Sequence, residues 1–322
     1  MYTIPELQQL IEKAIPAIEY PPHPKNLYDP ITYIMNLGGK RLRPALVLIA
    51  TDLFSGDVKA AMPAALAIET FHNFTLIHDD IMDNAPLRRG KQTVHEKWGV
   101  NNAILSGDVM MVEANKQLAQ VNAEVLKDVL NTFNATAQGV CEGQQLDMEF
   151  ETRDDVSIPE YINMIRLKTA VLVGGAMQLG AIISRANVAE TELIFDFGES
   201  LGIAFQLQDD ILDVYGDPDK FGKQVGGDII SNKKTFLLLN LQQAATAEDQ
   251  EILKKQLSNT DLNSKISAIT ALYEKYKIRE LATREMTAYL DKAFDALARI
   301  SVPDSRKVQL IQLSRELMNR EN

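Results

Sequence analysis

The sequence predicts an all-α fold, and three observations carry the prediction. Apolar residues recur every three or four positions, as at Leu46, Ile49, Ala50 and Leu53, which is the period of one helix face. The same spacing returns near the C-terminus, at Ile252, Leu253, Leu257, Ile266, Ile269 and Leu272. Strand-like alternation is scarce. No linker rich in Pro, Gly or Ser divides the chain, so residues 1–322 are expected to form a single domain.

Proline and glycine clusters mark the expected helix ends. Breaks are expected at residues 21–22, 38–39, 84–90, 106–107, 157–159 and 216–227. Pro44 fits the first turn of a helix, where its missing N–H costs nothing. The basic residues before Pro44 then lie at a helix N-terminus, whose unpaired amides favour an anion.

Composition and charge restrict the classes of function. A chain of 322 residues with 46% hydrophobic content can bury a large core. Its formal net charge of −11 argues against nonspecific binding to nucleic acid or to anionic lipid. We therefore expect no nucleic-acid partner, and an anionic ligand must be held by local basic residues or by metal.

Three features predict a cytoplasmic protein without an integral membrane segment. Cys141 is the only cysteine, so it has no internal disulfide partner, which suits a reducing compartment. The N-terminal segment lacks the positively led apolar run of a secretory signal. The longest uncharged apolar run, 169–184, is interrupted by glycines and is too short for a span, so we expect a buried core helix.

Two nearly identical acidic stretches, DDIMD at 79–83 and DDILD at 209–213, each follow apolar helical sequence. Residues four apart share a helix face, so Asp79 and Asp83 point the same way with Asp80 beside them. The second stretch repeats this arrangement with Asp209, Asp210 and Asp213. Close carboxylates repel one another unless a cation neutralises them. Magnesium fits best, because it takes one or two carboxylates and completes its shell with water and substrate phosphates.

Two alternatives compete with a magnesium site. A single acidic cluster is often only a solvated helix end, but two copies after apolar helices disfavour that interpretation. A calcium loop of the EF-hand kind is disfavoured because both stretches lack alternating oxygen ligands and a central glycine.

A set of basic residues lies beside glycines and the acidic stretches. Its members are Lys40, Arg43, Arg88, Arg89, Lys168, Lys223 and Lys233. Each alone is more often surface charge than ligand, but their shared placement predicts phosphate binding. Arginine binds phosphate oxygens bidentately, while lysine acts as a movable point charge.

Five stretches, in order and spacing, resemble the signature regions of the trans-isoprenyl diphosphate synthases, the polyprenyl synthetase family. They are GGKRLRP, HDDIMDNAPLRRG, LKT, FQLQDDILD and GKQVGGD, between about residues 38 and 235. The resemblance implies an isoprenoid synthase-type helical bundle around a deep central cavity, usually a homodimer. It also implies that the two aspartate motifs face each other across the cavity mouth.

The resemblance also assigns roles to individual residues. It implies that Asp79, Asp83 and Asp209 coordinate magnesium, with three ions present when substrate is bound. It makes Asp80, Asp210 and Asp213 either further close ligands or residues directly behind the ligands. It places Arg88, Lys168, Thr169, Gln206, Lys223 and Lys233 on an allylic diphosphate. It places Lys40, Arg43, His72 and Arg89 on isopentenyl diphosphate, bound without metal. Gln144 and Asp147 resemble a further segment that lines the metal site.

The implied reaction is a magnesium-assisted prenyl transfer. The five aspartates Asp79, Asp80, Asp83, Asp209 and Asp210, with Lys168, form the expected catalytic set. Cations stabilise the departing diphosphate, so the allylic C–O bond ionises, isopentenyl diphosphate attacks the cation, and a proton is lost. The segment 216–232 is expected to close over the phosphates and exclude water.

Two phenylalanines predict a short to medium product, farnesyl or geranylgeranyl diphosphate. Phe74 and Phe71 lie five and eight residues before Asp79, roughly 7.5 and 12 Å along a helix. An aromatic floor at that depth holds about two to four isoprene units. The alternative is that both rings are ordinary core residues. His72 shares the helix face of Asp79, whereas His78 is expected to be structural.

Three other functions compete with this one. A terpene cyclase would share the fold and the first aspartate cluster but has no need of the second cluster or of GGKRLRP. A metal phosphohydrolase, suggested by His78–Asp79, would use several histidines as ligands. A non-catalytic subunit of a heteromeric polyprenyl diphosphate synthase usually loses motif residues, and here the motifs are complete.

Overall fold

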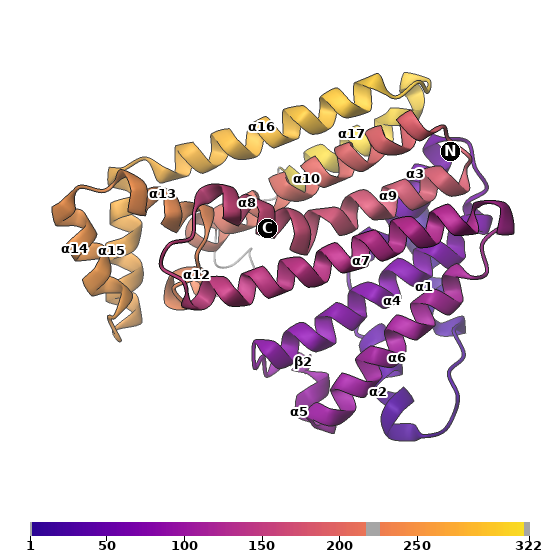
Figure 1. The fold of residues 1–322 in the computed structure, drawn as a ribbon, viewed down its shortest axis with the longest axis horizontal. Coiled ribbons are helices and arrows are strands. Elements are labelled where there is room, and N and C mark those ends of the chain that lie inside the picture. Colours follow the sequence, from indigo (N-terminus) through magenta and orange to yellow (C-terminus); the bar gives the residue numbers. More distant parts are fainter. Residues whose placement is uncertain (1, 217–225, 319–322) are drawn as a thin grey trace. The chain divides into compact units, whose positions relative to one another are not determined.

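A computed structural model describes residues 2–216 and 226–318, and the described chain is almost entirely helical (Figure 1), which confirms the all-α prediction. The chain divides into two compact units. The first comprises Met1–Ala137, Gly175–Ile194 and Ser301–Gln309. The second comprises Gln138–Gly174, Phe195–Ile300 and Leu310–Asn322.

The first unit holds the N-terminal elements. They are α1 (Ile4–Ala14), η1 (Ile15–Ala17), α2 (Lys25–Met35), α3 (Leu42–Leu53), α4 (Val58–Met82), β1 (Leu87–Arg88), β2 (Lys91–Gln92), α5 (Val94–Trp98) and α6 (Val100–Leu118). Four helices contribute to both units: α7 (Ala123–Thr152), α9 (Val171–Ile183), α10 (Val188–Tyr215) and α17 (Asp304–Met318). The remaining elements belong to the second unit: α8 (Ile158–Ile165), η2 (Arg166–Ala170), α12 (Gly227–Ile230), α13 (Phe236–Ala244), α14 (Ala247–Leu257), α15 (Leu262–Lys275) and α16 (Ile278–Arg299).

Helix α3 lies in the core of the first unit, which explains why its sequence is apolar on every face. Every residue from Pro44 to Thr51 is buried. Gly180 of α9 lies so close that an added Cβ would stand 2.9 Å from the Cβ of Ala50. Pro44 falls in the first turn of α3, as predicted.

A separate apolar cluster fills the second unit. Its buried members include Tyr161, Leu207, Leu237, Ile269 and Tyr273. Of the predicted C-terminal apolar positions, Leu253, Ile269 and Leu272 are buried. Ile252, at 41% exposure, is not, because it lies on the outer face of α14.

One sequence-based expectation about an element boundary was wrong, and one small element was not predicted. The break expected at Ser106 and Gly107 lies inside α6. The Ser106 hydroxyl donates to the carbonyl of Leu27 at 2.9 Å, and Gly107 leaves room for the imidazole of His78. Tertiary packing therefore uses these two residues within the helix. The two-residue strands β1 and β2 form a small hairpin that the sequence did not predict.

The apolar segment 169–184, expected to be a core helix, lies in η2 and α9 up to Ile183. By length and composition alone, Ile158–Ile183 is one candidate for crossing a membrane among the described residues. Of the 18-residue stretch of this segment that is apolar enough to cross a membrane, 61% is buried inside the protein. Burial of this kind is typical of a core helix, which supports the expectation.

Candidate active site

The first aspartate motif ends α4 in the first unit. Asp79 and Asp80 lie in the last helical turn, and the amide of Asp83 donates to the carbonyl of Asp79 at 2.8 Å. Asn84 adopts a left-handed conformation with φ +49° and ends the helix. Asp79 and Asp83 are therefore stacked one turn apart at a helix end, as the sequence predicted.

Asp80 differs from its neighbours because it is buried and paired with Arg88. It is 1% exposed, and the Arg88 guanidinium grips it through Nε at 2.9 Å and Nη2 at 2.7 Å. The chain turns back directly after the helix, where Asn84 has positive φ and the amide of Ala85 donates to the carbonyl of Asp80 at 2.9 Å. Strand β1 then pairs with β2 through a turn with positive φ at Arg89 and Gly90. Arg88, predicted on an allylic diphosphate, here contacts the motif itself.

A cluster of basic side chains surrounds His72. The Arg43 guanidinium lies 3.3 Å from His72 Nε2. Burial lowers the pKa of His72 well below its usual value, and the positive charges of Arg43, Arg89 and Arg88 act in the same direction. Arg89 donates to the carbonyl of Gly38 and lies directly over Gly39. The structure thus brings together Arg43, His72 and Arg89 of the set predicted for isopentenyl diphosphate.

Sequence reasoning missed the buried network beneath this cluster. Arg41, 7% exposed, pairs with Glu69, 3% exposed, and also donates to the carbonyl of Met35 at 2.6 Å. Asn73 donates to the same Glu69 carboxylate at 3.0 Å. Arg41 adopts a left-handed conformation with φ +46° as the N-cap of α3. This ion pair fixes the loop that carries Lys40, whose carbonyl accepts from Gln8 at 2.6 Å.

The second aspartate motif lies in the last two turns of α10, in the second unit. Asp210 is 4% exposed and accepts hydrogen bonds from the Tyr161 hydroxyl and, at 3.4 Å, from Gln206. Burial, together with the negative charge of Asp228, raises the pKa of Asp210 to about 7. Burial also raises the pKa of Tyr161, so the phenol keeps its proton and donates it. Tyr161 is a further residue that sequence reasoning missed.

The LKT stretch forms η2, a π-helical turn between α8 and α9. Such turns recur at functional sites, because the extra residue projects side chains out of the regular helix. Lys168 Nζ donates to Asp147 Oδ2 at 2.5 Å, and Thr169 donates to Gln206 at 3.3 Å. Three of the predicted diphosphate ligands are therefore linked to the second motif or to Asp147.

Two glycines allow neighbouring helices to approach η2. A Cβ added to Gly143 of α7 would lie 2.6 Å from the Cα of Lys168. A Cβ added to Gly202 of α10 would lie equally close, 2.6 Å, to the Cα of Ala170. Any larger residue at either position must displace the π-helical turn.

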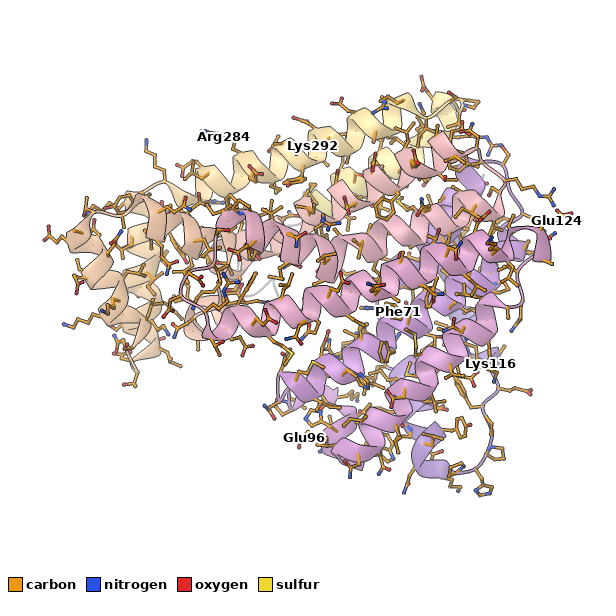
Figure 2. The ribbon with its side chains drawn as sticks, viewed as in Figure 1. Phe71, Glu96, Lys116, Glu124, Arg284 and Lys292 are labelled. Atoms are coloured by element: carbon orange, nitrogen blue, oxygen red, sulfur yellow. The ribbon has the colours of Figure 1, made fainter. Side chains whose placement is uncertain are left out.

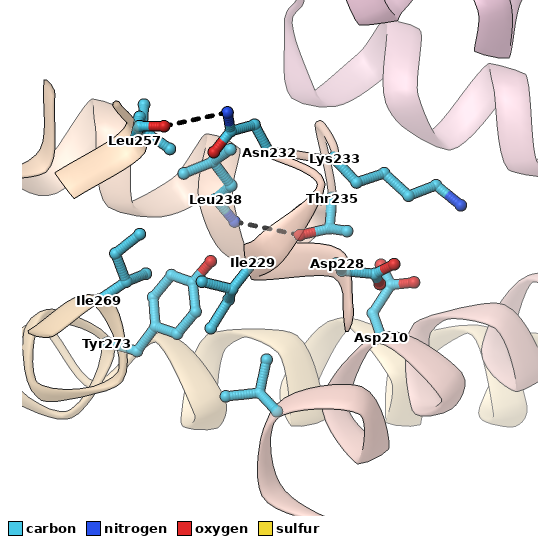
Figure 3. Close-up of a pocket in the computed structure, with 11 residues that line it drawn as sticks. Asp210, Asp228, Ile229, Asn232, Lys233, Thr235, Leu238, Leu257, Ile269 and Tyr273 are labelled. Atoms are coloured by element: carbon cyan, nitrogen blue, oxygen red, sulfur yellow. Dashed lines mark hydrogen bonds between the residues drawn. The ribbon is translucent and has the colours of Figure 1, made fainter. Parts of the chain in front are cut away.

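The short helix α12 follows the second motif and returns to it. The amide of Asp228 donates to Asp213 Oδ2 at 3.0 Å, and the amide of Gly226 donates to the Asp213 carbonyl at 2.6 Å. Figure 3 shows the side chain of Asp228 beside that of Asp210, with Lys233 lining the same small pocket. Lys223 and residues 217–225 of the segment expected to close over the phosphates lie outside the described residues.

The donor set fits magnesium better than a metal held by protein alone. Residues 2–216 and 226–318 contain no group of three or more His, Cys, Asp or Glu side chains arranged to hold a metal. Magnesium does not need one, since it uses few carboxylates and relies on water and substrate phosphates. Burial is the main cause of the raised pKa of Asp210, and the negative charge of Asp228 adds to it; a divalent cation bound nearby would offset that second contribution.

The two expected floor residues occupy different environments in the first unit. Phe71, labelled in Figure 2, is fully buried. Its ring centroid lies 5.4 Å from that of Phe133. Phe74 is half-buried, 5.5 Å from Phe71 and 4.8 Å from the His78 ring. His78 Nε2 lies 3.2 Å from the carbonyl of Ile104. These contacts are those of a packed residue, as expected for His78.

Comparison with known proteins assigns the family. A model of the polyprenyl synthetase family matches residues 24–276. The chain belongs to the polyprenyl synthetase family. It is a prenyltransferase, and its helices form the all-helical isoprenoid synthase fold. A metal phosphohydrolase is thereby excluded.

Individual relatives support this assignment. The chain is 38% identical over 286 residues to a geranylgeranyl diphosphate synthase from Saccharolobus solfataricus, covering 86% of this chain and 85% of that one. A crystal structure of a geranylgeranyl pyrophosphate synthase matches with a TM-score of 0.95 and 44% identity, covering 100% of both chains. A polyprenyl synthase from Caulobacter crescentus, complexed with calcium and isoprenyl diphosphate, matches with a TM-score of 0.86 and 27% identity over 99% of this chain and 98% of that one.

Proposed function

We propose that this polyprenyl synthetase condenses isopentenyl diphosphate with allylic diphosphates and releases geranylgeranyl diphosphate as its main product. The observation that carries the proposal is the basic cluster around His72. Arg43 and Arg89 gather beside an imidazole whose lowered pKa keeps it neutral at physiological pH. A diphosphate bound there is held by cations without metal, which a cyclase with one diphosphate substrate does not need.

Within the first unit, Lys40, Arg43, His72 and Arg89 bind isopentenyl diphosphate. Neutral His72 donates or accepts one hydrogen bond without adding to the repulsion among the arginines. The buried Arg41–Glu69 pair holds the loop in place, so the phosphate ligands are positioned before the substrate arrives.

Six aspartates and a set of cations serve the allylic diphosphate. The proposed magnesium ligands are Asp79, Asp83 and Asp209. The other three aspartates, Asp80, Asp210 and Asp213, support these ligands and each has a partner within the protein. Magnesium, when bound, neutralises the diphosphate so that the allylic C–O bond ionises. Arg88, Lys168, Thr169, Gln206, Lys223 and Lys233 are the proposed ligands of the same diphosphate. The Caulobacter crescentus polyprenyl synthase, complexed with calcium and isoprenyl diphosphate, supports the binding of a divalent ion together with a prenyl diphosphate.

The carbon chemistry requires no protein nucleophile. The allylic cation is attacked by the double bond of isopentenyl diphosphate, one C–C bond forms, and one proton leaves to the released diphosphate. Half-buried Phe74 forms the floor that limits growth, with Phe71 behind it. The relatives named for geranylgeranyl diphosphate support an end point of twenty carbons rather than fifteen.

We propose further that residues 1–322 act as one polyprenyl synthetase domain in a cytoplasmic homodimer. The observation that supports the dimer is an apolar face on α6. Ile104, Leu105 and Val112 project from one side of the helix and are 40%, 56% and 57% exposed. Large exposed apolar side chains gathered on one helix are typical of a protein interface.

The test is a primer series. The purified protein is incubated with magnesium, labelled isopentenyl diphosphate and, separately, dimethylallyl, geranyl and farnesyl diphosphates, and the products are sized after dephosphorylation. Twenty-carbon products from all three primers are expected. Longer products would show that Phe74 does not form the floor of the cavity. No elongation by folded protein would instead indicate a cyclase or a subunit of a heteromeric synthase. Cyclisation of geranylgeranyl diphosphate would identify the cyclase, and elongation restored by a partner protein would identify the subunit.

A further inference from the structure

A buried lysine anchors the C-terminal end of α12. Lys265 of α15 is 3% exposed, and its Nζ donates to the carbonyls of Ile230, at 3.0 Å, and Leu257, at 3.4 Å. Burying an ammonium group is costly, and burial lowers the pKa of Lys265. Both acceptors are main-chain carbonyls at the ends of α12 and α14, where helix carbonyls lack intrahelical partners.

Asn232 reinforces the same anchor. Its backbone is left-handed, with φ +56°, and its side-chain amide donates to the carbonyl of Leu257 at 3.1 Å. Leu257 therefore accepts from both Lys265 and Asn232. Asn232, which follows α12, and Lys265 of α15 therefore meet at the last carbonyl of α14.

The other end of α12 is fixed to the second aspartate motif. The amides of Gly226 and Asp228 donate to the carbonyl and the carboxylate of Asp213. A helix of four residues has no stability of its own, so its position depends on these end contacts. One end is set by the motif and the other by Lys265.

What α12 presents explains why this position matters. Asp228 lies in α12 and Lys233 follows it, and both line the pocket that also contains Asp210 (Figure 3). The amide of Lys233 donates to the carbonyl of Asp228 at 2.9 Å, so the position of Lys233 depends on that of α12. A shift of α12 would carry both away from Asp210.

We propose that Lys265 is a positioning residue for the allylic diphosphate. Its ammonium fixes α12 from behind, so that Lys233 and Asp228 are held beside the second aspartate motif. Lys265 itself does not touch substrate. This role rests on the proposed function, because it assigns Lys233 to the allylic diphosphate.

The test replaces the ammonium with an apolar group of similar length, Lys265→Met, and compares it with Lys275→Met. Lys275 lies on the same helix and ties α15 to α14 through Asp249 at 2.5 Å, but its partner is not in α12. We expect Lys265→Met to raise KM for farnesyl diphosphate about tenfold and leave KM for isopentenyl diphosphate unchanged, because loss of a charged hydrogen bond typically weakens a dependent contact by that order. Lys275→Met should change neither KM.

Two further readouts separate positioning from general destabilisation. Amide hydrogen exchange should accelerate in residues 227–235 of Lys265→Met, while residues of α8 and α13 keep their protection. Binding of farnesyl thiodiphosphate with magnesium, measured by calorimetry, should weaken in parallel with the KM change. Equal effects on both KM values, or faster exchange throughout the second unit, would overturn the proposal.

A milder variant keeps the test decisive if Lys265→Met does not fold. Asn232→Gly preserves the left-handed backbone and removes only the amide donor to Leu257, and the same selective rise in KM is expected. If the wild-type enzyme elongates no primer, the proposed function fails. The exchange measurement still shows whether Lys265 anchors α12, so the two failures are distinguishable.

Discussion

The middle aspartates of the two motifs have different electrostatic environments although their sequences nearly repeat. Asp80 is neutralised by the Arg88 guanidinium, whereas Asp210 accepts from the neutral phenol of Tyr161. Asp210 consequently has a pKa raised to about 7 by burial and by Asp228. The first motif therefore pairs its buried aspartate with an arginine, whereas the second pairs its buried aspartate with a phenol that keeps its proton.

At the residue scale, His72 should make stability depend on pH. Burial and neighbouring arginines hold its folded-state pKa well below the usual value. Below about pH 6.5 the unfolded chain binds a proton that the folded chain does not, so stability is full above that pH and falls as pH decreases. The wild type should lose stability relative to His72→Gln as the pH falls from 7.5 to 5, by at most about 1.4 kcal/mol for each pH unit below about 6.5. Urea unfolding of both proteins measures this, and parallel pH profiles would disprove it.

Phe74 should control product length, whereas Phe71 should mainly control stability. Phe74→Ala removes a half-buried ring next to Phe71, so we expect products longer by one or more isoprene units. Phe71→Ala empties a fully buried site and should cost about 3–5 kcal/mol. Product sizing and thermal unfolding distinguish the two variants. Leu76→Ala, on another face of α4, is the control, and equal lengthening by it would reject the floor.

At the scale of elements, the sequence predicted those helices and helix ends that follow from apolar periodicity and from the placement of glycine and proline. The helices carrying both aspartate motifs, the turn after Gly39 and the ends near 84 and 216 follow from spacing and from glycine and proline placement. The failures arise where long-range packing decides. Ser106 and Gly107 stay helical because α6 meets Leu27 and His78 there.

Several site contacts were likewise beyond reach of the sequence. Arg88 meets Asp80 because the chain reverses at Asn84 and Ala85 and continues into a short hairpin, and strands of two residues carry no periodic signal. Tyr161 and Glu69 looked like ordinary helical residues. Their roles depend on the partners that the fold supplies, namely Asp210 and Arg41.

The π-helical turn η2 yields a prediction about Gly143. Gly143→Ala places a methyl group within 2.6 Å of the Cα of Lys168, so the turn must shift and the Lys168–Asp147 contact must weaken. We expect kcat to fall about tenfold to hundredfold, as misplacement of a positioned group typically causes. Gly139→Ala is the matched control one turn earlier, where the nearest atom, on Val171, is 3.4 Å away. It should keep wild-type kcat, and a comparable loss there would refute the argument.

At the scale of the whole molecule, the exposed apolar face of α6 predicts a self-associating enzyme. Ile104, Leu105 and Val112 lie on one face with Asp108 between them. Two copies of this face related by a twofold axis would bury each other's apolar side chains. The two Asp108 carboxylates stay apart in such a dimer if Asp108 lies away from the axis. The wild type should therefore sediment as a dimer of 35.9 kDa chains.

Leu105→Glu should shift the protein toward the monomer, because burying an unpaired charge in the interface is costly. Ile252→Glu, at an exposed apolar residue on α14, should leave the dimer intact. Sedimentation equilibrium decides between these outcomes: a wild-type monomer, or a Leu105→Glu dimer as stable as the wild type, would show that this face is not the interface.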